Sequence, residues 1–136
     1  MSISYLVDTD WIIHYLKGRQ PFVGRLQALR ERGLAISVIT LGELYEGVYG
    51  TPEPEKKEQG LKDFLQGVVV LGIDEETCRL FGKERRRLRL AGGLPGDMDL
   101  FIGVTALRHN LTVLTNNRNH FERIENLHIE SLLVAP

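Results

Sequence analysis

The sequence predicts an α/β fold built around a parallel sheet. Short apolar segments rich in β-branched residues recur along the chain of 136 residues, and stretches with helical spacing separate them. This alternation is typical of βαβ units. One segment, VVVLGI at 68–73, has no polar side chain, which favours a strand buried on both faces of the sheet. No internal repeat or low-complexity linker is found, so we expect one domain over residues 1–136.

Each element is predicted from its local pattern. Helix boundaries are expected where proline or glycine interrupts the apolar spacing, as at Pro21, at Gly33 and in AGGLPG at 91–96. The expected strands lie at 3–7, 34–39, 68–73, 112–114 and around 128–134. The expected helices lie at about 21–33, 41–49, 75–90 and 99–109. A further helix is expected after GTPEPEKKEQG, with Leu61, Phe64 and Leu65 on one face.

Composition excludes several classes of protein. A net charge of −1 excludes a globally basic nucleic-acid binder, although it leaves local basic patches open. The lone cysteine, Cys78, excludes an internal disulfide and a multi-cysteine zinc site. The longest apolar run, 67–73, is too short to span a bilayer, and the N-terminus lacks the basic segment of a secretion signal. We therefore expect a soluble, cytoplasmic protein that has no membrane contact.

The first acidic group, Asp8 and Asp10, follows the first predicted strand. In open parallel sheets, ligands bind beyond the carboxyl ends of the strands, which places Asp8 at the functional edge. The alternative is that these residues only cap the next helix. We expect Asp10 to be the cap or an acid of the first turn, and the role of Asp8 stays open at this point.

Glu43 is the second candidate acid. On a helix that begins at Leu41 it points away from the apolar arc and shares a face with Gly47. Taken alone, it is a solvated glutamate, but it also lies in the first turn after the second strand. The predicted apolar arc consists of Leu41, Leu44, Tyr45, Val48 and Tyr49.

The third acidic group is Asp97 and Asp99, which precede the last long helix. Capping suits Asp97. Asp99 instead shares a face with Gly103 and Ala106, small residues that would let the helix press against the sheet.

Three acids from distant segments at one sheet edge indicate a cation site. Like charges close together repel and raise the pKa of each carboxyl group. Mg²⁺ or Mn²⁺ removes this penalty, because hard divalent ions favour carboxylate oxygens. Such an ion can activate water against a phosphodiester.

At these residues the sequence resembles the PIN-domain ribonucleases, in particular the VapC-type toxins of prokaryotic toxin–antitoxin pairs. Each matching motif is short, but all four occur in the family's order and at its spacing. They are LVDTDWII, SVITLGELYEGV, GDMDLFIGVTALRHNLTVLTNN and HFERIENLHIES.

The resemblance implies a three-layer α/β/α fold with a five-stranded parallel sheet. It also implies that Asp8, Glu43 and Asp99 hold Mg²⁺ or Mn²⁺, with Asp97 as a supporting acid. Thr9 would orient the pocket, and Asn117 matches the family's polar residue after strand four. Many relatives carry a further acid where this chain has NNRNH at 116–120. One well-held ion is therefore expected, and a second stays open.

The implied activity is hydrolysis of RNA by in-line attack of water, which leaves a 5′-phosphate and a 3′-hydroxyl. Structured RNA is the implied substrate, with tRNA a candidate target. The implied partners are a small antitoxin encoded elsewhere and a second copy of the chain in a homodimer.

A basic segment, KERRRLRL at 83–90, precedes the third acidic group. It is either a solvated helix or a surface that contacts RNA phosphates, and it would give salt-dependent affinity without base specificity. Its candidate RNA-binding residues are Arg85, Arg86, Arg87 and Arg89, and Arg108, Arg118 and Arg123 could extend it. His120 stays open as a further functional residue, because it lies where relatives carry the fourth acid.

Two alternatives remain. A haloacid-dehalogenase-type phosphatase would use Asp8 and Asp10 with Lys62 or Lys83, but Trp11 stands where that family has glycine. The other is a PIN-like module that binds RNA or protein without catalysis, which the missing fourth acid favours.

Overall fold

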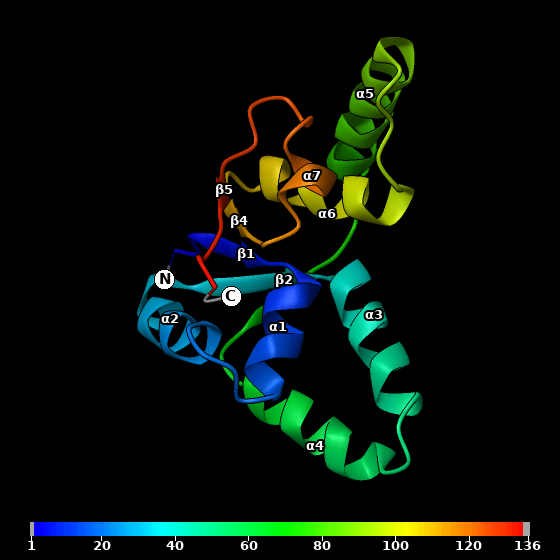
Figure 1. The fold of residues 1–136 in the computed structure, drawn as a ribbon. Coiled ribbons are helices and arrows are strands. Elements are labelled where there is room, and N and C mark those ends of the chain that lie inside the picture. The colour runs from blue at the N-terminus through cyan, green and yellow to red at the C-terminus, as the bar shows by residue number, and fades with distance from the viewer. Residues whose placement is uncertain (1, 135–136) are drawn as a thin grey trace.

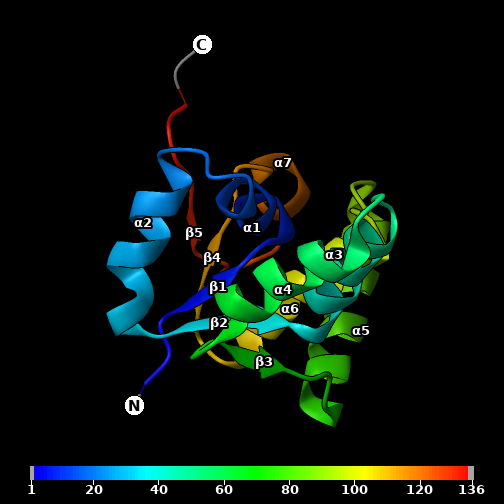
Figure 2. The same ribbon diagram turned by 90° about the horizontal axis from the view of Figure 1, so that it is seen from below.

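The computed structural model describes residues 2–134, so Met1 and residues 135–136 of the predicted domain lie outside it. A sheet of five parallel strands runs through the molecule in the order β3-β2-β1-β4-β5, as Figure 2 shows. The five-stranded parallel sheet is therefore confirmed. The strands are β1 (Tyr5–Val7), β2 (Leu34–Ser37), β3 (Val69–Leu71), β4 (Thr112–Leu114) and β5 (Ile129–Glu130).

Helices cover both faces of the sheet and complete three layers (Figure 1). One layer contains α1 (Thr9–Leu16), α2 (Phe22–Leu29), α3 (Val38–Tyr49) and α4 (Pro54–Leu65), with a short 3-10 helix at Arg30–Arg32. The other contains α5 (Glu75–Ala91), α6 (Asp97–Arg108) and α7 (Arg118–Phe121). None of the helices within residues 2–134 is both long and apolar enough to cross a bilayer.

Alternating side chains of the strands pack into two separate hydrophobic cores, one on each face of the sheet. Tyr5 and Val7 of β1 pack with α1–α4, whereas Leu6 between them packs with α5–α7. Successive residues of a strand point to opposite faces, so a central strand is apolar at neighbouring positions wherever both of its faces are buried. Burial on both faces therefore explains the apolar segments of β1, β2 and β4.

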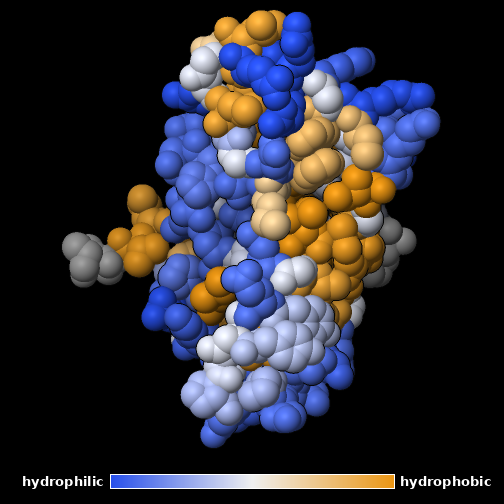
Figure 3. All heavy atoms as spheres, turned by 90° about the vertical axis from the view of Figure 1, so that its right-hand side faces the viewer, coloured by the Kyte–Doolittle hydropathy of each residue, from blue (hydrophilic) through white to orange (hydrophobic). Residues whose placement is uncertain are grey.

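The prediction of two-sided burial is wrong for VVVLGI. β3 pairs with β2 alone and lies at the edge of the sheet, and Val69 and Val70 are 42% and 41% exposed. Ile73 and Val38 are exposed as well. Figure 3 shows apolar side chains gathered over part of the surface on the side of α3, α5 and α6. A continuous apolar run thus marks an exposed edge here rather than a central strand.

Helix starts differ most from prediction. α3 begins at Val38 rather than Leu41, because the Ser37 side chain accepts a hydrogen bond from the Ile39 backbone N (3.1 Å) and ends β2. Glu43 therefore lies in the second turn of α3 rather than the first. Tyr49 was expected in the apolar arc but is 69% exposed at the end of α3.

Candidate functional site

The candidate site lies where the strand order reverses. β1 lies between β2 and β4 in the sheet. The chain continues from β1 to β2 and β3 on one side and then returns to β4 on the other side, so the carboxyl ends of β1 and β4 form the switch point. Ligands of open α/β sheets bind at such a point. Asp8 directly follows β1, and its backbone N donates to the Leu114 carbonyl of β4 (2.9 Å). The predicted position of Asp8 is confirmed.

The Asp8 carboxylate is buried and fixed by two hydrogen bonds. Its Oδ1 accepts from the Thr9 backbone N (2.8 Å), and its Oδ2 accepts from Thr115 Oγ1 (2.7 Å). The pKa of Asp8 is raised to about 7, chiefly by burial and also by the negative charges of Asp10 and Asp99, although the two hydrogen bonds oppose this rise. Asp8 is both the N-cap of α1 and an acid held in an environment that disfavours its negative charge.

Asp10 lies in the first turn of α1 and is not its N-cap. Its Oδ1 accepts from the Trp11 backbone N (2.8 Å), and its Oδ2 accepts from the Asn116 backbone N (3.0 Å). Asp10 therefore ties the start of α1 to the loop after β4. The first-turn alternative of the prediction is confirmed.

Glu43 reaches the site from α3 through Thr9, whose hydroxyl donates to Glu43 Oε1 (2.7 Å). The same hydroxyl lies 3.3 Å from Thr40 Oγ1. Thr9 thus makes its side-chain contact with Glu43 rather than with Asp8.

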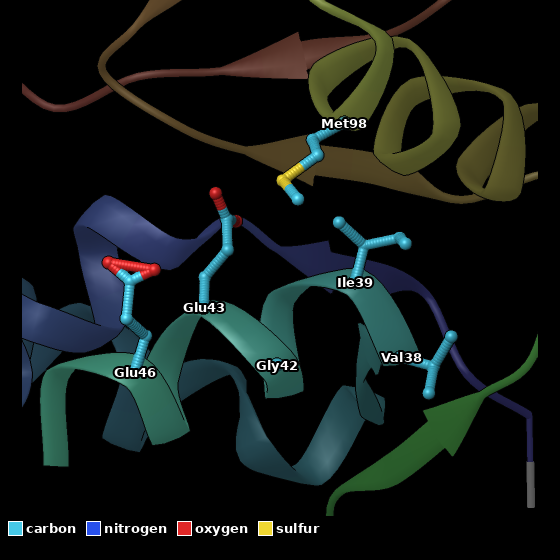
Figure 4. Close-up of a pocket in the computed structure, with 6 residues that line it drawn as sticks. All are labelled: Val38, Ile39, Gly42, Glu43, Glu46 and Met98. Carbon is cyan, nitrogen blue, oxygen red and sulfur yellow. The ribbon is translucent and has the colours of Figure 1, made fainter. Parts of the chain in front are cut away.

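A hollow of about 410 Å³ opens beside Glu43. Figure 4 shows Glu43 and Ile39 of α3 pointing into it, with Met98 of α6 on the opposite side. A second hollow of about 700 Å³ lies between α1, α3 and α4, and Glu43 lines it too. The Glu43 carboxylate is therefore accessible to a large ligand.

Asp99 lies in the first turn of α6, and its Oδ2 is 3.1 Å from His120 Nδ1 of α7. Burial raises the pKa of Asp99, and Asp10 adds to this effect, while the contact with His120 lowers it. The charge of Asp99 also raises the pKa of Asp8, so these two predicted acids are close enough to influence each other.

Asp97 does not cap α6, which was its expected structural role. α6 begins at Asp97 itself, with Gly96 at the N-cap position. The Asp97 side chain is 57% exposed, and its Oδ1 accepts from Arg85 Nε of α5 (2.8 Å). Asp97 therefore links α6 to α5 rather than facing Asp8.

We expected Gly103 to let α6 approach the sheet, but this residue does not face the sheet. It faces the segment after α7, and a Cβ at this position would overlap Ile124 Cδ1. Ala106, in contrast, is fully buried in the core beside the sheet. The small residue at Gly103 thus sets how closely α7 and its His120 approach α6.

The acids share one edge without enclosing a common point. Within residues 2–134, no three Asp, Glu, His or Cys side chains come together closely enough to hold a metal ion as they stand. Each acid instead turns to a donor of its own: Asp8 to Thr115, Glu43 to Thr9 and Asp99 to His120. Mutual repulsion of carboxylates explains this arrangement.

Sequence reasoning missed Thr115 and gave Asn116 no role. Thr115 is fully buried and donates to Asp8. The Asn116 Oδ1 accepts from Trp11 Nε1 (3.0 Å) and from the Leu132 backbone N (2.9 Å), which locks the loop after β4. Asn117, the predicted residue, is exposed and contributes its backbone N to Thr115 Oγ1 (3.0 Å). The rule that placed Asp8 after β1 could have found Thr115 after β4.

The predicted basic patch is partly neutralised. Arg85 pairs with Asp97, and Arg87 Nε donates to Glu84 Oε1 (2.7 Å). Arg86 and Arg89 are exposed, and neither forms a salt bridge within the described residues. Of the residues that could extend the patch, Arg108 pairs with Asp74 and Arg118 donates to Ser131.

The lysine required by the phosphatase alternative is not beside Asp8. Lys62 lies 3.5 Å from Glu58 on α4, and Lys83 is exposed on α5. No lysine among residues 2–134 hydrogen-bonds to Asp8.

Comparisons with known proteins identify the family of the chain. Residues 5–127 match the PIN domain family. The chain is 39% identical to Ribonuclease VapC1 of Methanocaldococcus jannaschii, over 88% of this chain and 80% of that protein. It is 30% identical to the tRNA(fMet)-specific endonuclease VapC of Salmonella typhimurium, over 94% and 97% of the two chains. Its fold matches VapBC2 from Rickettsia felis, solved bound to a promoter DNA fragment, with a TM-score of 0.89 and 29% identity over 96% and 99% of the two chains.

Proposed function

The chain belongs to the PIN domain family, and on that premise we propose that it is a metal-dependent endoribonuclease of the VapC type. The observation that carries this proposal is Asp8, an acid that is 4% exposed at the switch point of the sheet and close enough to Asp10 and Asp99 to be affected by their charge. Capping α1 accounts for one oxygen of Asp8, but it does not account for the neighbouring acids, whose charges raise the pKa of Asp8. Two relatives, one named as a ribonuclease and one as a tRNA(fMet)-specific endonuclease, match most of the chain and support the assignment.

The donor set suits a hard divalent cation. Asp8, Glu43 and Asp99 offer carboxylate oxygens, which Mg²⁺ and Mn²⁺ prefer. Burial and, to a smaller extent, neighbouring acids raise the pKa of Asp8 and of Asp99, and a bound cation would favour their charged forms. We assign the ion to these three acids, with Glu43 turning from Thr9 to reach it. Asp97 stays outside, paired with Arg85.

The other residues hold the acids in place. Thr115 Oγ1 and the Thr9 backbone N fix both oxygens of Asp8, and the Thr9 hydroxyl holds Glu43. When bound, the ion would activate water and neutralise charge that develops on the phosphate. The oxygen of water forms a bond to phosphorus while the bond from phosphorus to the 3′-oxygen breaks. The products are a 5′-phosphate and a 3′-hydroxyl.

The substrate we propose is structured RNA, and tRNA is the first class to test. The relative from Salmonella typhimurium is named as specific for one tRNA. Arg86 and Arg89 would contact phosphates, which gives affinity that falls with salt. We also propose a small antitoxin that covers the hollow beside Glu43, since a structure of similar fold is a toxin–antitoxin complex from Klebsiella pneumoniae. A homodimer is proposed as well.

The test is RNA cleavage by purified protein freed of any antitoxin. Total RNA and a tRNA pool are incubated with Mg²⁺, with Mn²⁺ and with EDTA. Asp99→Asn serves as the inactive variant, and Asp97→Asn is the matched control because it lies two residues away but outside the site. Discrete fragments from wild type and Asp97→Asn alone are expected. Fragments that persist with Asp99→Asn or EDTA would contradict the proposal, and RNA binding without cleavage would favour the non-catalytic module.

A further inference from the structure

His120 lies in α7 and contacts Asp99, one of the acids assigned to the proposed metal site. Its Nδ1 lies 3.1 Å from Asp99 Oδ2, and its side chain is 45% exposed. Because α7 is short, this placement depends on the packing of the residues after the histidine. Phe121 is fully buried and Ile124 packs against Gly103 of α6. Packing against α6 therefore holds the imidazole beside Asp99.

The separation between these two atoms suits two neighbouring ligands of one ion. Nitrogen and oxygen donors lie about 2.1 Å from a small divalent ion, so two donors at right angles to each other are roughly 3.0 Å apart. His120 Nδ1 and Asp99 Oδ2 already stand 3.1 Å apart. An ion could thus replace the contact between them without a large movement of α7.

An imidazole changes which ion such a site prefers. Mg²⁺ strongly favours oxygen donors, whereas nitrogen donors suit the first-row transition ions. We propose that His120 joins Asp8 and Asp99 as a metal ligand and gives the site a preference for Mn²⁺ over Mg²⁺. This inference rests on the metal site of the proposed function.

A competing role for His120 predicts the opposite result. If the histidine only neutralises Asp99 as a cation, it competes with the metal ion for that carboxylate. Removing it would then raise the affinity for Mn²⁺ and Mg²⁺ alike. The direction of the change in affinity therefore separates a ligand from a competitor.

The experiment is isothermal titration of the RNA-free protein with MnCl₂ and with MgCl₂. We expect His120→Asn to weaken Mn²⁺ binding by at least roughly tenfold, as loss of metal-site partners does elsewhere, and to affect Mg²⁺ less. His120→Asp should restore tight Mg²⁺ binding and reverse the preference. His109→Asn is the matched control, since His109 follows the other end of α6 from Asp99, and it should change neither affinity.

A second measurement detects the bond between the His120 nitrogen and the metal ion directly. Pulsed electron paramagnetic resonance on Mn²⁺-loaded protein with ¹⁵N-labelled histidine should show a nitrogen coupling that is absent in His120→Asn and present in His109→Asn. Suppose that wild type binds both ions and that Asp8→Asn abolishes binding. If His120→Asn then changes neither the ratio of the two affinities nor the nitrogen coupling, the role of His120 is refuted and the metal site of the proposed function stands. If wild type binds neither ion, the metal site of the proposed function fails with it.

Discussion

Replacing Gly103 with alanine tests how α7 is held against α6. Gly103 is buried in α6, and an added Cβ would overlap Ile124 Cδ1 while making ordinary contacts with Leu127 (3.5 Å) and Phe121 (3.6 Å). Gly82 is a matched position in α5, where a Cβ meets nothing within 4 Å. The same change of residue thus enters one crowded site and one open site.

The expected magnitudes come from two opposing effects. Alanine in place of glycine inside a helix stabilises by about 0.5–1 kcal/mol, and this is the whole effect expected of Gly82→Ala. Overfilling a packed core costs about 1–3 kcal/mol. Gly103→Ala should therefore range from neutral to about 2 kcal/mol destabilising, and the two variants should differ by about 1–3 kcal/mol.

Urea denaturation of the four proteins of a double-mutant cycle supplies the assay. Ile124→Val removes the overlapping Cδ1 and costs about 0.5–1.5 kcal/mol alone. In the Gly103→Ala background it should cost less or even stabilise, with a coupling of at least about 1 kcal/mol. Additive effects within about 0.3 kcal/mol, or a Gly103→Ala protein as stable as Gly82→Ala, would refute the close packing of α6 against the segment after α7.

Three further predictions concern the site and its surroundings. Thr115→Val removes the hydroxyl that fixes Asp8 and should weaken metal affinity by roughly 10–100-fold in calorimetry. Thr105 is also buried, but its hydroxyl donates to the Phe101 carbonyl, so Thr105→Val should leave the metal affinity unchanged. Equal effects of the two variants would contradict the role assigned to Thr115. Ser37→Ala removes the cap of α3 and should lower the free energy of unfolding by about 1 kcal/mol in urea, and no change would exclude the capping bond as a source of stability. Arg86→Ala and Arg89→Ala should each reduce, by about one unit, the slope of the logarithm of RNA affinity against the logarithm of salt concentration. Arg79 is already paired with Glu75 and Glu76, so Arg79→Ala should leave this slope unchanged. An equal reduction in all three variants would indicate a non-specific charge effect.

The fold was predictable because its signals are local. Central strands such as β1 need apolar residues on both faces, and the glycines and proline at 91–96 end α5 where expected. β3 shows the limit of this reasoning. Its run of valines has the composition of a central strand, and only the strand order, which depends on the whole chain, places it at the edge.

The site was predictable in part, for a related reason. Asp8 was placed correctly because the end of a strand locates the edge of a parallel sheet. Thr115, which fixes Asp8, lies 107 positions along the chain; the same rule places it at this edge, but its bond to Asp8 depends on β4 lying beside β1. Asp97 had the spacing of a cap, but its pairing with Arg85 depends on how α5 lies against α6. Contacts between distant segments decide these roles.

The most direct test of the metal site is anomalous diffraction from crystals of the protein soaked in MnCl₂. We expect one strong anomalous peak at the carboxyl ends of β1 and β4, within coordination distance of Asp8 and Asp99, and none in crystals of Asp8→Asn. A peak elsewhere on the molecule, or a peak that persists in Asp8→Asn, would contradict the assignment of Asp8 as the centre of a metal-dependent nuclease.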